Sequence, residues 1–194
     1  MVEMNSEFDL SVILLHESMV DKTGKGVTTS LTLNDIQDLA RSSKSYGAHT
    51  LFVAHPAPAL RKLANRLLVH WLKGFGSTYN SDRKNAMQSV EIISTIDEAI
   101  LKIDLRTGKN PKLIATSARD GSDRIDYAEL RSLICKNDQP YLLMLGTGWG
   151  MSSELMNRAD YILKPIKGPV PYNHLSVRSA CAITLDRLLG IRSV

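Results

Sequence analysis

The sequence predicts an α/β fold in which a parallel sheet is flanked by helices. Short apolar runs alternate with segments of helical spacing along the whole chain, a pattern typical of a parallel sheet. Several runs are continuously apolar, as expected for strands that helices cover on both faces. Loops rich in glycine or proline directly follow the last two runs. Because ligands of α/β proteins bind outside the carboxyl ends of the strands, we expect these loops to form a small-molecule site.

Six apolar runs have the length and composition of buried strands. They are Leu10–Leu15, Leu51–Ala54, Val90–Ile93, Leu113–Thr116, Tyr141–Leu145 and Tyr161–Leu163. Helical spacing fills the intervals between them, first over residues 33–47 and then over residues 60–74, each ending near a glycine. Thr95-Ile-Asp-Glu98 is a capping box that opens a third helix. Further helices are expected at Asp126–Leu133, Ser152–Met156 and Leu175–Leu189.

Length and composition predict one ordinary globular domain, residues 1–194. Hydrophobic residues make up 43% of the 194 residues and charged residues 23%, which is enough to bury a core without disulfides. Cys135 and Cys181 have no metal or redox spacing, so a reducing cytoplasm is the expected location. No run approaches the roughly 20 apolar residues that span a bilayer, and the acidic start MVEMNSEFDL does not resemble a signal peptide.

The formal net charge of +4 slightly favours polyanionic partners such as RNA, although on charge alone a mildly basic solvated surface is the better explanation. Between the second and third helices, the polar segment Lys73–Lys84 combines Phe75 and Tyr79 with Arg83. One interpretation is a nucleic-acid contact, with a base stacked on Tyr79 and phosphates on the cations. The alternative is an ordinary surface loop, a common connection between elements.

The segment Gly146-Thr-Gly-Trp-Gly150 follows the fifth strand directly. Its glycines allow the backbone to take positive φ and to approach a ligand closely. The order of the glycines does not match a dinucleotide fingerprint, and no Gly-Lys-Ser/Thr follows as in a P-loop. The segment is therefore either a ligand-binding loop of another type or a tight turn.

The segment Lys164–Arg178 contains three prolines and a glycine, and brings Asn173, His174 and Ser176 to the start of the last helix. It fits the floor of a polar small-molecule pocket, while helix capping alone would explain one of these residues. After the fourth strand, Thr116 and Ser117 either bind a ligand or form a turn, and Arg119 suits a phosphate or carboxylate.

Other catalytic classes are poorly supported. There is no G-x-S-x-G elbow, and the five histidines show no metal spacing. His16 and His55 each end a predicted strand. Arg41 lies within the first predicted helix, where it either binds phosphate near a pocket or is simply solvated.

Two motifs carry a family resemblance. Leu143-Met-Leu-Gly-Thr-Gly-Trp-Gly-Met151 and Tyr172-Asn-His-Leu-Ser-Val-Arg-Ser-Ala180 resemble those of the SPOUT, or α/β-knot, RNA methyltransferases, in particular a small stand-alone bacterial group. The resemblance extends from Val12 to Leu189. It implies a C-terminal trefoil knot, a homodimer joined through the last helix, and an RNA substrate, tRNA or rRNA. It also implies S-adenosylmethionine (AdoMet) as the cofactor, held by loops after Ile114, after Leu145 and from Pro165 to Ser176.

The resemblance further implies particular site residues. Those expected at the cofactor are Thr116, Ser117, Leu145, Gly146, Gly148, Gly150, Ile166, Gly168, Tyr172, Asn173, His174, Leu175 and Ser176. Arg41 and Asn34 correspond to the catalytic pair of the ribose 2′-O-methylating branch, although Asn34 lies one residue farther from Arg41 than that pattern has it. The alternatives are an AdoMet-binding sensor or partner protein without RNA methyl transfer, and a flavodoxin-like or other doubly wound nucleotide binder.

Overall fold

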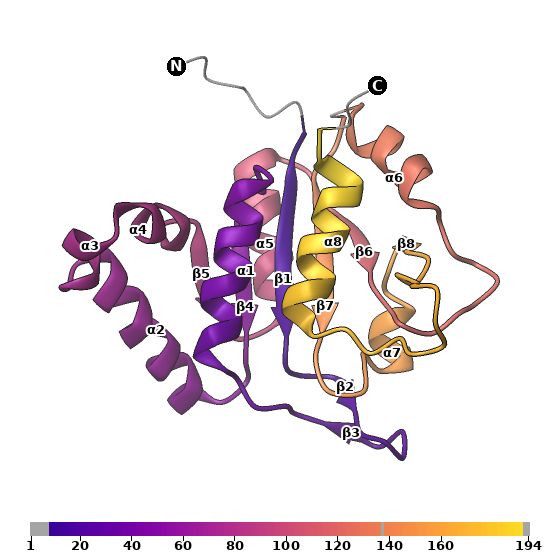
Figure 1. Cartoon of the computed structure of the whole chain (residues 1–194), viewed down its shortest axis with the longest axis horizontal. Helices are drawn as coiled ribbons and strands as arrows, with labels where there is room; N and C mark the ends of the chain where they lie inside the picture. The colour runs from indigo at the N-terminus through magenta and orange to yellow at the C-terminus, as the bar shows by residue number, and fades with distance from the viewer. Residues whose placement is uncertain (1–7, 137, 192–194) are drawn as a thin grey trace.

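A computed structural model describes residues 8–136 and 138–191, and its centre is a six-stranded sheet (Figure 1). The strand order is β5-β4-β1-β7-β6-β8, and every neighbouring pair is parallel. The strands are β1 Leu10–Leu15, β4 Leu51–Ala54, β5 Val90–Ile93, β6 Lys112–Ala115, β7 Tyr141–Gly146 and β8 Tyr161–Ile162. The predicted parallel α/β sheet is confirmed, and the first seven residues of the acidic start lie outside the described residues.

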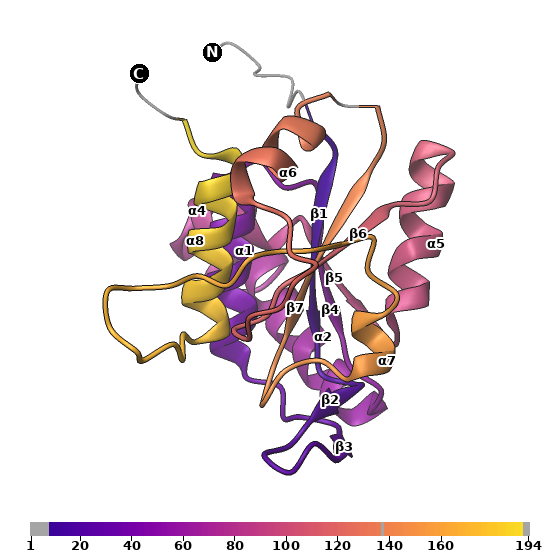
Figure 2. The same ribbon diagram turned by 90° about the vertical axis from the view of Figure 1, so that its right-hand side faces the viewer.

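Helices cover both faces of the sheet, which is why the strand sequences are continuously apolar (Figure 2). All six residues of β1 are buried, and alternate side chains enter opposite cores. One core is shared with α1 Leu33–Ser45, α2 Pro58–Leu72, α4 Ser81–Met87, α6 Tyr127–Ile134 and α8 Val177–Leu189. The other is shared with α5 Ile96–Thr107 and α7 Ser153–Met156.

Side-chain caps define where several helices begin. Thr95 accepts a hydrogen bond from the Glu98 amide at 3.3 Å, as the capping box predicts. The Glu98 carboxylate, however, accepts from the amide and hydroxyl of Ser94 rather than from the Thr95 amide. The observed helices begin within about two residues of the predicted starts, which is the usual uncertainty of helix ends.

Two parts of the chain differ from the prediction. A hairpin of β2 Met19–Val20 and β3 Gly26–Val27 follows β1, although these two-residue strands have no recognisable periodicity. The segment 73–84 contains α3 Gly76–Tyr79 and the start of α4 instead of an ordinary loop. The Asn80 side chain caps α4 by accepting from the Arg83 amide at 2.8 Å.

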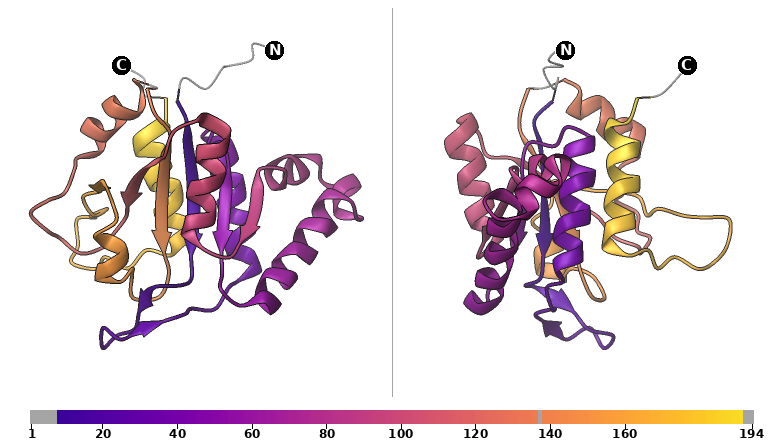
Figure 3. Two further views of the ribbon diagram at one scale, coloured as in Figure 1. Left: turned by 180° about the vertical axis from the view of Figure 1, so that it is seen from behind. Right: turned by 60° about the vertical axis from the view of Figure 1, so that its left-hand side comes forward.

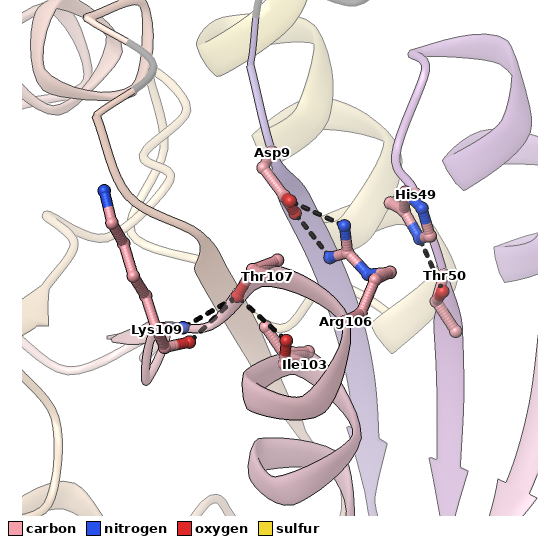
Figure 4. Close-up of polar contacts among 7 residues, drawn as sticks. All are labelled: Asp9, His49, Thr50, Ile103, Arg106, Thr107 and Lys109. Atoms are coloured by element: carbon pink, nitrogen blue, oxygen red, sulfur yellow. Dashed lines mark hydrogen bonds and ion pairs between the residues drawn. The ribbon is translucent and has the colours of Figure 1, made fainter.

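An ion pair joins α5 to the start of the sheet, at the edge opposite the carboxyl ends of the strands (Figure 4). The Arg106 guanidinium donates to both carboxylate oxygens of Asp9, at 2.7 and 2.8 Å. Two parallel hydrogen bonds between charged groups fix the geometry better than a single contact does.

We expect Asp9→Ala to lower the free energy of unfolding by about 1 kcal/mol, because both bonds of the fork are lost at a half-buried position. Urea denaturation at neutral pH measures this change. Asp97→Ala, which removes the exposed partner of Arg158, serves as the control and should leave stability within about 0.5 kcal/mol. Equal losses in the two variants would contradict a special role for the Asp9 pair.

Candidate functional site

The carboxyl ends of the parallel strands lie at one edge of the sheet, and the loops after β6, β7 and β8 meet there (Figure 1). The loop after β8, residues 163–176, leads to α8 and projects from the body of the molecule beside that helix (Figure 3). This is the edge at which open α/β sheets bind ligands.

The loops after β6 and β8 are joined directly. The Asn173 amide Nδ2 donates to the Ala118 carbonyl at 2.9 Å, and Lys167 forms an ion pair with Asp120 at 2.7 Å. Between these loops lies a hollow of about 370 Å³, within the size range of small-molecule sites. Its lining is mixed polar and apolar: Ala118, Asp120, Lys167, Gly168, Val170, Pro171 and Asn173.

The glycine loop after β7 reaches the same region through aromatic rings. The indole of Trp149 lies edge-on to the His174 ring, 6.1 Å between centroids, and Tyr172 lies 5.9 Å from that same ring. Trp149 and Tyr172 are both largely exposed. The third loop therefore contacts the loop after β8 but does not line the hollow itself.

Leu145 and Gly146 lie within β7, and the remaining predicted residues of the loops after β6 and β8 fall into two groups. Ser176 caps α8 by accepting from the Ser179 amide, Thr116 donates to the Met144 carbonyl, and Ser117 accepts from the Arg119 amide. These hydroxyls therefore have local structural partners. Residues placed at the edge without such a bond are Ile166, which is half-buried, and Leu175, which is exposed.

The β2–β3 hairpin holds the glycine loop along its backbone. The Val20 amide donates to the Gly150 carbonyl at 2.9 Å, and the Trp149 amide donates to the Val20 carbonyl at 3.2 Å. Met19 forms an isolated bridge with Met151. The hairpin thus fixes the loop at Gly148, whose φ of +62° lies in the left-handed region that glycine adopts without strain.

The sequence did not predict a series of buried side-chain hydrogen bonds beneath this loop. The Thr147 hydroxyl donates to the Leu15 carbonyl at 2.9 Å, so it accepts from the Thr29 hydroxyl. Thr29 in turn accepts from Nδ1 of His16 at 3.0 Å. This arrangement satisfies all three side chains only if His16 carries its proton on Nδ1. His16 Nε2 is then a buried acceptor without a hydrogen-bond partner among the described residues.

Burial lowers the pKa of His16 to about 4, with a smaller lowering from His55 and an opposing effect from Asp35. The two imidazole rings lie 5.3 Å apart, at the ends of β1 and β4. His55 accepts from the Ala57 amide and donates through Nε2 to the Thr29 carbonyl. The one sequence signal for this cluster was that both histidines end a strand.

Arg41 and Asn34, the predicted catalytic pair, lie on one side of α1, about 10 Å apart along the helix axis. Both are exposed. Arg41 lines a second open hollow of about 420 Å³ together with Asp38, Ser42, Ser45 and Tyr46. This hollow shares no lining residue with the one between the loops, so within one described chain Arg41 and the loops border separate hollows, and Asn34 lines neither of them.

Comparison with known proteins identifies the family. A sequence profile described as "SAM-dependent RNA methyltransferase" matches residues 9–190. This chain belongs to that family. The match covers all six strands of the central sheet and extends from β1 at one end to α8 at the other.

Two curated relatives are similar to this methyltransferase over most of its length. It is 40% identical over 179 residues to an uncharacterized protein of Aquifex aeolicus, covering 92% of this chain and 87% of the other. It is 41% identical over 182 residues to a protein of Oleidesulfovibrio alaskensis named tRNA (guanine-N(1)-)-methyltransferase. The match covers 94% of this chain but only 42% of that relative, so the name describes a protein more than twice as long.

A solved structure shows the fold type. The SpoU methyltransferase AviRb of Streptomyces viridochromogenes, determined in complex with AdoMet, superposes with a TM-score of 0.57 at 18% identity. The match covers 93% of this chain and 57% of that one. The methyltransferase thus has the sheet and helix arrangement of the SPOUT class.

We expect Gly148→Ala to weaken AdoMet binding by this methyltransferase about tenfold. The new methyl would lie 2.9 Å from Thr29 Cγ2, and Thr29 cannot move without disturbing its bonds to His16 and Thr147. Isothermal titration calorimetry with AdoMet measures the effect. Gly24→Ala is the matched control, since Gly24 also has positive φ but an alanine methyl there would meet no atom within 4 Å. Equal affinities of the two variants would contradict the role of the Thr29 contact.

Proposed function

We propose that the three loops bind AdoMet, and that the chain, as a single domain of residues 1–194, transfers its methyl group to tRNA or rRNA. The observation that carries the proposal is the junction of the loops after β6 and β8 through Asn173 and Ala118 around a hollow at the carboxyl edge of the sheet. The family supplies the reaction type and the cofactor.

The residues at this edge fit a polar, charged small molecule. Backbone groups of the glycine loop suit an adenine or ribose edge, because glycines allow close approach. Lys167 and Asp120 provide charges of both signs beside the hollow, matching a ligand with a carboxylate and an amino group. When bound, AdoMet supplies an electrophilic methyl group, and the protein must hold the acceptor atom in line with it.

The catalytic contribution belongs to Arg41 and Asn34 in this proposal. A guanidinium keeps its positive charge in proteins, so Arg41 orients a phosphate or stabilises developing negative charge at the acceptor. Because its hollow is separate from the loops within one chain, we assign Arg41 to the site of a second copy in a homodimer.

Part of the apolar face of α8 is already used within the chain. Leu185 and Leu188 are buried, while Arg178 binds Asp35 and Asp38 of α1. The proposed dimer therefore forms through the exposed side of α1 and the start of α8, next to the projecting loop. The proposal includes the C-terminal trefoil knot and a cytoplasmic location, both of which follow from the resemblance to the SPOUT class and from the sequence. Separately, none of the helices in residues 8–136 and 138–191 is long and apolar enough to cross a membrane.

Labelled methyl transfer tests the proposed activity. Purified protein and radiolabelled AdoMet are incubated with bulk tRNA and rRNA from a strain that lacks the gene, since those RNAs have the target position unmodified. We expect label in one RNA class and none in RNA from the parent strain. Calorimetry should detect AdoMet binding but not NAD or FMN binding; a response to NAD or FMN alone would favour the doubly wound nucleotide binder.

A second candidate is an AdoMet-binding sensor or partner protein without RNA methyl transfer. The observation that favours it is the exposed, separate position of Arg41 and Asn34 in the single chain. This candidate predicts AdoMet binding with no methyl transfer to any RNA fraction. The same labelling experiment therefore decides between the two candidates.

A further inference from the structure

A cationic arm extends from the β5 side of the sheet. It consists of α2, α3 and α4, and it leads away from the carboxyl edge toward the periphery of the molecule (Figure 1). Residues 58–88 contain six Lys and Arg but one Asp and no Glu, whereas the whole chain has 24 Lys and Arg against 20 Asp and Glu. The remaining residues thus hold 18 cations and 19 acids. The net positive charge of the protein resides on this arm.

The charges form a row along the outer side of α2. Lys62, Arg66 and Lys73 follow one another at spacings of four and seven residues, which places them on one side of the helix. The opposite side, with Ala64, Leu68 and Trp71, packs into the core. None of the three cations forms an ion pair with any residue in the described part of the chain, although lysine and arginine form eight such pairs elsewhere in it.

Two aromatic rings end the row. Phe75 and Tyr79 are 75% and 76% exposed, and their rings stack at 5.9 Å with an interplanar angle of 24°. The pair is held in place from below: Gly76 packs so closely on Trp71 that a Cβ would lie 2.6 Å from Trp71 Cε3. Thr78 and Ser77 donate to carbonyls of the preceding turn, which further fixes the short helix. An apolar pair of this kind would normally be buried.

Rigid exposed aromatic rings beside unpaired cations have the chemistry of a single-stranded nucleic-acid site. Bases stack on aromatic faces irrespective of their sequence, while lysine and arginine contact the phosphates. A symmetric contact between the arms of two copies would bring like-charged surfaces together, which disfavours that form of dimer. The arm begins at the carboxyl edge, because β4, which precedes α2, lies about 14 Å from β6 across the sheet, and α2 then extends about 22 Å outward toward the aromatic pair.

We infer that the arm formed by α2, α3 and α4 binds a single-stranded part of the RNA substrate, with a base stacked on Phe75 and Tyr79 and phosphates on Lys62, Arg66 and Lys73. This inference rests on the proposed function for the identity of the RNA as a substrate. It assigns the arm to substrate recognition and the loops after β6, β7 and β8 to the cofactor.

Fluorescence anisotropy with a labelled single-stranded oligouridylate tests the arm directly. The aromatic variant Phe75→Ala/Tyr79→Ala should weaken binding about 5- to 100-fold, the usual effect of losing a stacking platform. The charge variant Arg66→Glu/Lys73→Glu should weaken binding. It should also reduce the slope of log Kd against log salt concentration by about 1.4, because two phosphate contacts are lost. AdoMet affinity should stay unchanged in both.

Matched controls lie on other surfaces. Leu101→Ala/Leu105→Ala removes an apolar pair of the same spacing on α5, where the side chains are 56% and 76% exposed. Lys109→Glu/Lys136→Glu makes the same change in net charge at the opposite edge of the sheet. Both controls should bind the oligonucleotide within about twofold of the parent protein.

Unchanged oligonucleotide binding by both arm variants would overturn the inference. If the aromatic variant in addition changed the molar mass in solution, measured by light scattering, the arm would be a protein interface instead. Because binding is measured without methyl transfer, failure of the arm is distinguishable from failure of the proposed activity, which the labelling experiment reports separately.

Discussion

Arg41→Ala should reduce methyl transfer at least about 100-fold while AdoMet affinity stays within about twofold of the parent protein. The guanidinium is exposed and lies outside the hollow between the cofactor loops, so removing it leaves those loops intact. Single-turnover transfer to RNA and calorimetry with AdoMet measure the two quantities. Lys44→Ala removes an exposed cation one turn farther along α1 and should retain transfer. Retained turnover in the Arg41 variant would remove the catalytic assignment.

Mixing two inactive variants tests whether Arg41 acts across a dimer. Gly148→Val disrupts the glycine loop of one copy, and Arg41→Ala removes the guanidinium of the other. If the site combines loops of one copy with Arg41 of the second, mixed dimers regain one intact site. Equal mixing should then restore about a quarter of the parent activity, since half of the dimers are mixed. No recovery from a mixture shown to exchange subunits would place both parts of the site in one chain.

The sheet was predictable because its strands are buried on both faces. A run such as Leu51–Ala54 has no polar residue and is too short for a buried helix, so both its type and its limits follow from the sequence. The hairpin at Met19–Val20 was not predictable, because two-residue strands have no period. The short helix Gly76–Tyr79 was not predicted for another reason. Glycine disfavours helices, and Gly74 and Gly76 lie just before and at the start of this one. Both glycines pack closely on the end of α2, Gly76 against Trp71, which the sequence does not show.

The cofactor loops were predictable because glycine and proline change the backbone wherever they occur. Their mutual contacts were not, since the bond from Asn173 to Ala118 joins positions 55 residues apart. The series of hydrogen bonds from His16 through Thr29 to Thr147 was even harder to predict. Thr29 and Thr147 are 118 residues apart, and neither threonine has a pattern that distinguishes it from a solvated one. The parallel pairing of β1 with β7 brings Thr147 beside the end of β1, and the hydrogen bond from the Thr29 amide to the His16 carbonyl at 2.9 Å brings Thr29 to the same place.

His16 should make the protein less stable in mild acid. Its pKa of about 4 in the folded state lies below the ordinary value of 6.5, because burial disfavours the imidazolium and no acceptor for a second N–H is found among the described residues. Below pH 6.5 the unfolded chain therefore binds a proton that the folded chain does not. The stabilising effect of neutral His16 is complete above pH 6.5 and is lost as the pH falls toward 4, at about 1.4 kcal/mol per pH unit and about 3 kcal/mol in total.

Urea denaturation between pH 7.5 and 4.5 measures this loss against His16→Asn. The asparagine amide can still donate to Thr29 but does not titrate, so the difference in unfolding free energy between the two proteins should change with pH while carboxylate effects cancel. Protonation would also disturb the Thr29 and Thr147 hydroxyls that support the glycine loop. Because the folded protein takes up this proton only as the pH approaches 4, AdoMet affinity should be the same in the parent protein and the variant near neutral pH and should fall more steeply in the parent only toward pH 4. A difference in unfolding free energy that does not change with pH would show that folding does not lower the pKa of His16.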